Sequence, residues 1–326
     1  MKTAESVTPS HPDKICDQIS DAILDACLKE DPDTRAAIEV LGGHGLITIC
    51  GELTTKAYVN MREIATRVYK DLGYVEQIGV TINVVEQSPE IGSGVDADGA
   101  GDQGIMVGYA TSETPESLPL ELVLARKLTK AMGARDGKAQ VTVEDGKVVQ
   151  VLTSVCEHCD VDDVELEEVM EKEITPHLHE KVTSLKDIWM RNPNGKWTVG
   201  GFAADTGLTG RKLAVDNYGP NIPLGGGCFS GKDSTKVDRS GAYMARRIAV
   251  DYLKERKASE VYVHLAYAIG VAEPVMAVVT VDGAQEDIKG YDLKPQAIIK
   301  ALDLKSPKFE ETAKHGHFGN GFAWDV

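Results

Sequence analysis

The chain has 326 residues, of which 42% are hydrophobic and 26% are charged, a composition typical of globular proteins and a length that predicts two or three compact units. Its formal net charge of −16 argues against broad contact with a nucleic-acid backbone or an anionic membrane. The sequence has neither an apolar run of about twenty residues nor the apolar core of a signal peptide, so we expect a cytoplasmic protein with reduced cysteines.

A long amphipathic helix is predicted first, within residues 11–31, because apolar residues recur there at four-residue steps from Ile15 to Cys27. Ser10 is the expected N-cap, and Pro12 suits the first turn. The charged residues that follow the cap would lie at the positive end of the helix, where phosphate or a metal-phosphate complex is readily held. These residues are His11, Asp13 and Lys14.

Three rounds of a β-hairpin followed by a helix are expected next along the chain. The second hairpin has Asp145 and Gly146 as its turn, a pair typical of tight hairpins. Hairpins that recur with helices favour an α+β fold over a doubly wound parallel sheet, so we predict three similar sheet-plus-helix units. The hairpins span 35–55, 140–155 and 261–281, the helices 61–73, 161–174 and 295–304, and the units 1–87, 99–199 and 200–326, with glycine-rich joins at 88–104 and 200–212.

Four short stretches gather charged residues, three of them together with glycine. Glycine lets the backbone approach a ligand closely, lysine and arginine neutralise phosphate oxygens, and aspartate can hold Mg²⁺. Together the stretches predict a site for a magnesium polyphosphate, although solvated charges on a loop would explain any one of them alone. The stretches are residues 10–14, 99–104, 205–212 and 225–239.

The last of these stretches, GGGCFSGKDSTKVDR, is a near match to a phosphate-binding P-loop. Gly226, Gly231 and Lys232 have the spacing of G-x-x-x-x-G-K-[ST], but Asp233 stands where the magnesium-binding hydroxyl is required. The stretch is therefore either a degenerate nucleotide loop or a phosphate cradle of another kind.

Other catalytic motifs are absent from the sequence. It contains no G-x-S-x-G nucleophile elbow, no H-E-x-x-H zinc helix and no G-x-G-x-x-G after a convincing strand. Cys156 and Cys159 form a C-x-x-C pair with His177 and His179 downstream, but the spacing of the histidines is not that of a usual zinc site. Ordinary helix and strand residues explain this group better than a metal does.

Several separated motifs, in order, resemble the S-adenosylmethionine synthetase (methionine adenosyltransferase) family along nearly the whole chain. The opening helix segment, the central glycine loop, the phosphate-binding turn and the triple-glycine stretch all resemble the signatures of the family. The segments that carry the resemblance are residues 5–26, 99–111, 205–219, 225–243, 267–274 and 316–319.

The resemblance implies an activity, a fold and partners. In this family the sulfur of methionine attacks the ribose C5′ of ATP, and the displaced triphosphate is then cleaved to phosphate and pyrophosphate. The expected fold is three α+β units in a pseudo-threefold arrangement, with segments interleaved between units. The expected ligands are ATP and L-methionine with a pair of Mg²⁺ ions per site and K⁺. A homodimer with active sites between its subunits is implied, or a tetramer built from two dimers, with neither nucleic acid nor membrane as a partner.

Carried over position by position, the resemblance implies a catalytic set and an ATP-binding set. From the residues alone, His11 is only a helix-start residue. The catalytic set is His11, Arg211, Lys212, Lys232 and Lys236, and the ATP-binding set is His11, Asp136, Gly137, Lys138, Lys196, Trp197, Asp205, Arg211, Lys212, Cys228 and Lys232.

The resemblance also implies a methionine site and metal ligands. Carboxylates suit the amino group of methionine, and Mg²⁺ prefers oxygen ligands. The implied methionine-binding residues are Glu52, Gln87, Asp102, Asp205, Lys236 and Ile269, and the implied metal ligands are Asp13 and Asp238 for Mg²⁺ and Glu39 for K⁺.

The sequence departs from the family pattern in several places. Trp197 stands where Phe is usual, Leu224 where His is common, and His44 in a turn that usually has Lys-Thr. The segment between Gln87 and Asp102, the active-site lid of the family, is short, and the chain stops soon after the terminal motif. Two alternatives to a methionine adenosyltransferase remain open. One is a catalytically silent homologue that binds ATP or methionine, and the other is a P-loop-like kinase or ATPase.

Overall fold

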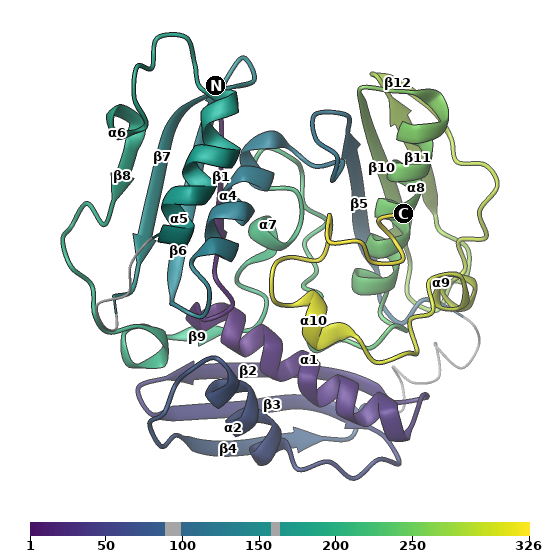
Figure 1. Cartoon of the computed structure of the whole chain (residues 1–326). Helices are drawn as coiled ribbons and strands as arrows, with labels where there is room; N and C mark the ends of the chain where they lie inside the picture. The colour runs from purple at the N-terminus through teal and green to yellow at the C-terminus, as the bar shows by residue number, and fades with distance from the viewer. Residues whose placement is uncertain (89–98, 158–163) are drawn as a thin grey trace.

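The computed structural model describes residues 1–88, 99–157 and 164–326 (Figure 1). Within these residues the strands form three four-stranded sheets, which we name after their lowest-numbered strand. The β1 sheet has the order β1 (Lys2–Val7), β6 (Gly137–Glu144), β7 (Lys147–Val155) and β8 (Trp189–Arg191). The β2 sheet has the order β4 (Gly79–Val85), β3 (Leu46–Thr54), β2 (Arg35–Gly43) and β9 (Gly207–Leu208), and the β5 sheet has the order β12 (Ala284–Asp287), β11 (Met276–Val281), β10 (Glu260–Tyr267) and β5 (Gly104–Thr111).

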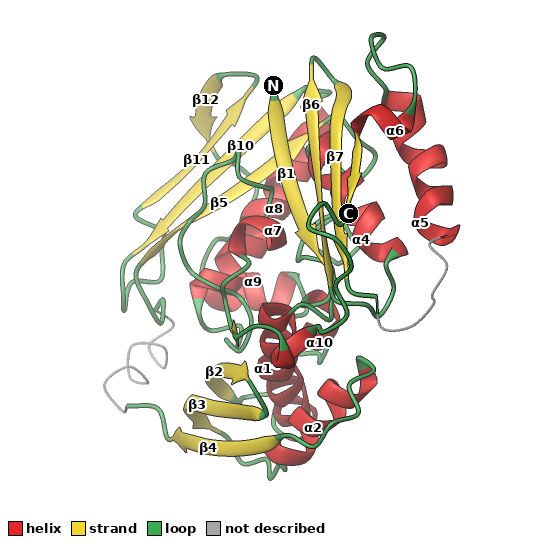
Figure 2. Cartoon of the chain, turned by 90° about the vertical axis from the view of Figure 1, so that its left-hand side faces the viewer, coloured by secondary structure: helices red, strands yellow, loops and turns green. Residues whose placement is uncertain are grey.

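Each sheet packs helices on one face, and in Figure 2 each sheet lies to the left of the helices that cover it. Helices α1 (Pro12–Glu30) and α2 (Met61–Asp71) cover the β2 sheet, α4 (Leu120–Ala131) covers the β1 sheet, and α8 (Val237–Arg256) covers the β5 sheet. The three sheet-plus-helix units predicted from the sequence are confirmed. The shorter helices are α5 (Val164–Val169), α6 (Leu185–Ile188), α7 (Leu213–Asp216), α9 (Pro295–Ala301) and α10 (Phe309–Thr312), with π-helical Met170–Ile174 and 3₁₀ turns at Thr175–His177 and Gly201–Ala203.

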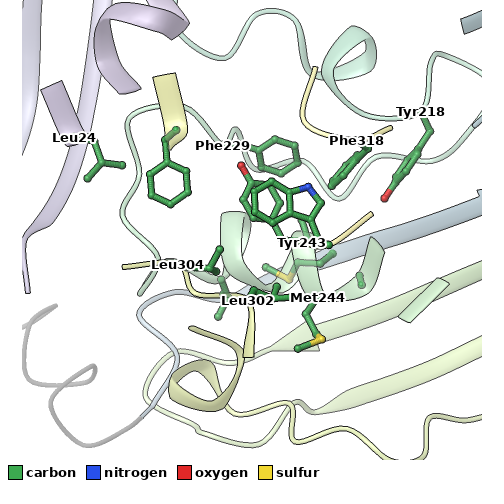
Figure 3. Close-up of a cluster of buried hydrophobic side chains, with 14 of the residues drawn as sticks. Leu24, Tyr218, Phe229, Tyr243, Met244, Leu302, Leu304 and Phe318 are labelled. Atoms are coloured by element: carbon green, nitrogen blue, oxygen red, sulfur yellow. The ribbon is translucent and has the colours of Figure 1, made fainter. Parts of the chain in front are cut away.

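An aromatic cluster closes the core where the C-terminal segment returns to α8 (Figure 3). The rings of Tyr243 and Trp324 stack with centroids 3.8 Å apart, and those of Tyr218 and Phe318 stack at 4.9 Å. Phe229 lies against Tyr243 and Phe318, so the loop before α8 is anchored in the same cluster. The described part of the chain contains no helix that is long and apolar enough to cross a membrane.

The long first helix is confirmed, but its cap and its surroundings differ from the prediction. His11, not Ser10, is the N-cap, because its Nδ1 accepts the Asp13 amide at 3.2 Å while the Ser10 hydroxyl donates to the Ala134 carbonyl. An amphipathic helix usually turns its polar side to water, yet α1 is buried from Pro12 to Leu24. The polar side of α1 therefore faces other parts of the chain.

The predicted hairpins are confirmed, and their turns have the expected backbone. Asp145 and Gly146 have φ of 50° and 74°, and His44 and Gly45 have φ of 48° and 84°. Positive φ at both central residues is the turn geometry that matches the twist of hairpin strands. The helix predicted over 161–174 begins at Val164 among the described residues and passes into the π-helical turn at Met170.

Candidate active site

The start of α1 forms the first part of the site. The short strand β9 passes so close to this helix that a Cβ on Gly207 would lie 2.1 Å from the Pro12 carbonyl oxygen. The Leu208 amide donates to Asp13 Oδ1 at 2.9 Å, and Lys212 Nζ donates to Asp13 Oδ2 at 2.5 Å. Burial raises the pKa of Asp13, but these two hydrogen bonds together with the Lys212 charge keep the pKa below its usual value. An ionised carboxylate and a lysine thus meet beside the helix start.

His11 is a neutral side chain in this structure. Burial, aided by the nearby Lys212 and Lys138 charges, lowers its pKa to about 3. Because Nδ1 accepts the Asp13 amide, the ring proton of the neutral form belongs to Nε2. His11 can therefore offer a hydrogen bond without carrying charge.

The second part of the site lies at the start of α8. Lys232 Nζ donates to Asp238 Oδ2 at 2.5 Å. The triple-glycine loop lies directly on this carboxylate, since a Cβ on Gly227 would be 2.1 Å from the Asp238 carboxyl carbon. Glu39 on β2 is near enough to Lys232 to feel its charge, which opposes the rise that burial causes in the Glu39 pKa. Burial raises the pKa of the neighbouring Cys228 to about 11, so this thiol stays protonated.

Asp233, the residue that spoils the P-loop motif, is a structural carboxylate. It is 1% exposed and accepts the Ala36 amide, the Thr235 amide and the Thr235 hydroxyl. It also accepts Lys236 Nζ at 2.5 Å. The helix begins only at Val237, so the stretch lacks the Lys-then-helix geometry of a P-loop. Lys236 therefore has a buried carboxylate as its partner.

A row of aspartates on α1, which sequence reasoning missed, connects the two parts. Four-residue steps place Asp13, Asp17, Asp21 and Asp25 along one side of the helix, and we call them the aspartate row. Each accepts at least one backbone amide from a distant segment: Leu208, Gly210, Gly231, and residues 308–310, respectively. The spacing was present in the sequence and could have been noticed there.

The residues expected around the nucleoside lie in two places. One is the start of β6, near His11, and the other is the turn after Gly200. Asp136 accepts the Gly201 amide at 2.8 Å, and burial raises its pKa to about 6. The Gly137 carbonyl accepts the Thr8 amide, and the Gly137 amide donates to the Thr8 hydroxyl, which ties β6 to the segment before His11. Lys138 and Asp205 are exposed.

Lys196 and Trp197 lie apart from these residues in the chain. Both line a surface cavity of about 460 Å³ with Ser154 and residues 192–199. The Trp197 indole N–H donates to the Val199 carbonyl, and the Trp197 carbonyl accepts the Glu157 amide. The indole is half-buried, so one part of the ring is open to the cavity.

Four of the six residues expected at methionine fall in two pairs at the ends of two sheets, while Asp205 and Lys236 lie with the residues described above. Gln87 follows β4, and its amide donates to Thr54 near Glu52 on β3. Asp102 precedes β5, while Ile269 follows β10, is 54% exposed and pairs with Ala100. In the part of the chain that the structure describes, none of these four side chains hydrogen bonds to His11, Arg211 or Lys232. Most of the expected lid, residues 89–98, lies outside the described residues.

No group of three or more His, Cys, Asp and Glu side chains among the described residues could hold a metal ion by itself. Mg²⁺ in proteins is commonly held by one or two carboxylates together with substrate phosphates, and Asp13 and Asp238 fit that pattern. Cys159 of the C-x-x-C pair lies outside the described residues. Arg211, 52% exposed with its Nε 3.5 Å from Asp13 Oδ1, completes the cations near α1.

Three family models match the chain in succession: the S-adenosylmethionine synthetase N-terminal domain over residues 1–93, the central domain over 97–197 and the C-terminal domain over 199–326. The chain belongs to the S-adenosylmethionine synthetase family. The resemblance stated from the sequence is thereby confirmed, and neither the silent homologue nor the kinase is supported.

Curated relatives of the S-adenosylmethionine synthetase family match nearly the full chain. It is 44% identical to the S-adenosylmethionine synthase of a Sulfurovum species, over 99% of this chain and 95% of the relative. Identity is 43% to the synthase of a Nitratiruptor species, over 99% and 94%, and 42% to that of Pseudothermotoga lettingae, over 99% and 95%. The Sulfurovum alignment extends over 365 positions, more than the 326 residues here, so that relative carries insertions.

Proposed function

We propose that the chain is a methionine adenosyltransferase that makes S-adenosylmethionine from ATP and L-methionine and hydrolyses the triphosphate to phosphate and pyrophosphate. The observation that carries the proposal is the pairing of Lys212 with Asp13 and of Lys232 with Asp238, on separate loops of a chain of this family. Fixed cations of this kind stabilise a highly charged leaving group, which is the main requirement of this reaction.

The chemistry needs positioning and charge rather than a base. A lone pair on the methionine sulfur forms the new bond to the ribose C5′, and the C5′–O bond breaks with its electron pair moving to the triphosphate. The thioether has no proton to lose, so no general base takes part. His11 Nε2–H donates a hydrogen bond to the bridging oxygen as that oxygen gains charge, and Arg211, Lys212 and Lys232 hold the triphosphate. Water then cleaves the triphosphate held by the same cations.

The implied cations have matching oxygen groups in the chain. Asp13 and Asp238 would hold Mg²⁺, because ionised carboxylates are its usual protein ligands. Bound Mg²⁺ would spread the negative charge of the phosphates. Glu39, half-buried and acidic, would serve the K⁺ site.

The other implied residues are assigned to recognition of the two substrates. Trp197 stacks on adenine at its cavity, where an indole can replace a phenyl ring. The nucleoside side is completed by Asp136, Gly137, Lys138, Lys196 and Cys228, and the methionine side by Glu52, Gln87, Asp102, Asp205, Lys236 and Ile269. Lys236 would contact methionine while its ion pair with Asp233 remains in place.

The working form is a homodimer in the cytoplasm, in which the outer faces of the sheets meet. The faces away from the helices carry exposed apolar side chains: Leu41 at 45%, Leu46 at 46%, Ile105 at 54% and Met276 at 40%. Exposed apolar side chains that gather into a patch mark protein interfaces, so we assign these strands to the dimer interface. Closure of this face would bring a second copy to the sheet ends that carry Glu52, Gln87, Asp102 and Ile269. Cys16, Cys27, Cys50 and Cys228 are free thiols, which is compatible with a reducing compartment.

The activity is tested directly by incubating the purified protein with ATP, L-methionine, Mg²⁺ and K⁺ and detecting the sulfonium product by mass spectrometry. We expect product, phosphate and pyrophosphate in equal amounts. Release of phosphate without any sulfonium product would refute the proposal.

The role of Lys232 is tested by Lys232→Ala, with Lys254→Ala in the last turn of α8 as the control. Loss of one fixed cation from the leaving-group site should lower kcat by about 10²-fold. Lys254 is exposed and far along α8, so its variant should match the wild type. Circular dichroism spectra that match for all three proteins would establish that folding is intact, and an active Lys232→Ala protein would contradict the assignment.

A further inference from the structure

Two loops that carry the phosphate-binding cations are fixed to the same helix. Asp17 Oδ1 accepts the Gly210 amide at 2.8 Å, one residue before Arg211. Asp21 Oδ1 accepts the Gly231 amide at 2.8 Å, one residue before Lys232. Each inner member of the aspartate row therefore holds the backbone immediately ahead of a cation.

The held amides belong to glycines that no other residue can replace without strain. Gly210 and Gly231 have φ of +79° and +81°, in the left-handed region. A Cβ on Gly231 would lie 2.0 Å from the Ile38 carbonyl oxygen, and one on Gly210 would lie 2.7 Å from Cys228 Cβ. The second contact also brings the two loops against each other, so a shift in one loop would reach the other.

Asp17 differs from the rest of the row in its side-chain environment. Lys14 Nζ lies 3.1 Å from Asp17 Oδ2 and 2.6 Å from Asp216 Oδ1, and all three side chains are buried. Asp21 is bound to the buried Arg239 at 2.7 Å, so its removal would strand a buried cation. Removal of Asp17 leaves Lys14 with Asp216 as its partner. Asp17 can therefore be changed without stranding a charge.

We propose that Asp17 is a positioning residue for the triphosphate site. Through the Gly210 amide it fixes the turn that presents Arg211 and Lys212, and through the row it keeps that turn in register with Lys232. The inference rests on the proposed function for the identity of the anion, but its central claim concerns the geometry of the polyphosphate-binding loops. Small displacements of such groups have large effects on binding and rate.

The test compares Asp17→Ala and Asp17→Asn with Asp25→Ala as the matched control. Asp25 lies on the same helix and also accepts backbone amides, at 3.1, 3.0 and 2.9 Å, but those amides belong to Lys308, Phe309 and Glu310. Asparagine keeps an oxygen for the Gly210 amide, whereas alanine does not. The measurements are the affinity for inorganic tripolyphosphate by calorimetry, the KM for ATP with kcat, and the thermal unfolding midpoint.

We expect Asp17→Ala to weaken tripolyphosphate binding and raise the KM for ATP by about tenfold or more, which is the effect of losing a buried hydrogen-bond acceptor. Asp17→Asn should recover most of that loss. Asp25→Ala should lower the unfolding midpoint while leaving tripolyphosphate affinity within about twofold of the wild type.

Two outcomes would overturn the inference: wild-type affinity in Asp17→Ala, or equal loss of affinity in Asp17→Ala and Asp25→Ala. If Asp17→Ala does not fold, Asp17→Ser takes its place, because the shorter side chain leaves the Gly210 amide out of reach. A wild-type protein that binds tripolyphosphate but forms no sulfonium product would refute the proposed function alone, and the binding measurements would still decide the role of Asp17.

Discussion

His11 has two separate tasks, one for each ring nitrogen. Nδ1 caps α1 by accepting the Asp13 amide, and the N–H on Nε2 is left for a ligand. A cap of this kind stabilises a helix by about 1 kcal/mol. The fold thus holds the imidazole in the neutral form with its donor in place.

The buried neutral state of His11 makes the stability of the protein sensitive to acid. Its pKa in the folded chain is about 3, against an ordinary value of 6.5. Between these two pH values the unfolded chain binds a proton that the folded chain does not, so stability contributed by this group falls as the pH falls below 6.5.

We therefore predict that His11→Asn, which keeps a good cap and removes the titration, matches the wild type in free energy of unfolding at about pH 7.5. At about pH 5 it should gain about 2 kcal/mol relative to the wild type, because a difference of one pKa unit is worth about 1.4 kcal/mol. Urea unfolding at both pH values measures the difference. A difference that stays constant between the two pH values would mean that His11 titrates alike in the folded and unfolded chains, and it would contradict the prediction.

Single residues were predicted unevenly from the sequence. His11, Asp13, Lys212 and Lys232 were predicted as site residues because they stand in motifs, and the structure pairs Lys212 with Asp13 and Lys232 with Asp238. Asp17 was missed, since a regular row of aspartates on a helix usually indicates a solvated face. Only the fold reveals that other loops lie against this face.

At the scale of elements, α8 connects the β5 sheet to the C-terminal segment through one side chain. Arg246 NH1 donates to the Tyr109 and Ser117 carbonyls, NH2 donates to the Glu116 carbonyl, and Nε donates to Asp325 at 3.0 Å. The guanidinium is fully buried. Its planar fork satisfies several acceptors at once.

We predict that Arg246→Met lowers the free energy of unfolding by about 3–5 kcal/mol, because it removes the cationic partner of the Asp325 side chain and the donor of several carbonyls. The neighbouring Arg247 is half-buried and has fewer partners, Asp251 at 2.8 Å and the Ala323 carbonyl at 3.0 Å, and it provides the control. Arg247→Met should cost no more than about 1 kcal/mol. Urea titration of both variants checks the prediction, and similar losses in the two would show that Arg246 has no special role.

Elements were predicted well where the signal is local. The hairpin turn at Asp145 and Gly146 was readable because positive φ favours those residues. The cap at Ser10 was wrong because His11 can accept the same amide and Ser10 found a carbonyl partner instead. The π-helical turn at Met170 has no sequence signal that we recognise.

At the scale of the whole molecule, the one-sided arrangement of sheets and helices predicts self-association. Leu41→Glu would place a charge in the proposed dimer face, where an unpaired charge is strongly unfavourable. We expect this variant to sediment as a monomer under conditions where the wild type is a dimer, and to lose activity with it.

Val75→Glu is the control for this experiment, because Val75 is 90% exposed in the loop after α2, away from the outer sheet face. It should sediment as the wild type does. Sedimentation velocity at micromolar concentration distinguishes the species, and a wild-type protein that is monomeric and fully active would contradict the dimer proposal.

The sheet partners could not be found from the sequence by local reasoning. Three sheet-plus-helix units were predicted, but nothing in residues 104–111 indicates that they pair with 260–267, or that 2–7 pair with 137–144. Strand pairing over such separations depends on the tertiary packing of both faces, which periodicity does not encode.

These distant pairings have a consequence for how the polypeptide is made. β5 leaves the ribosome long before its partner β10, and β2 before β9, so during synthesis each waits with an open edge that other chains could join. Contacts this remote in sequence also slow folding. We therefore expect the final form to be reached only when synthesis is almost complete. Protein fragments that end at the boundaries of the three matched segments would expose unpaired strand edges, and we expect them to aggregate.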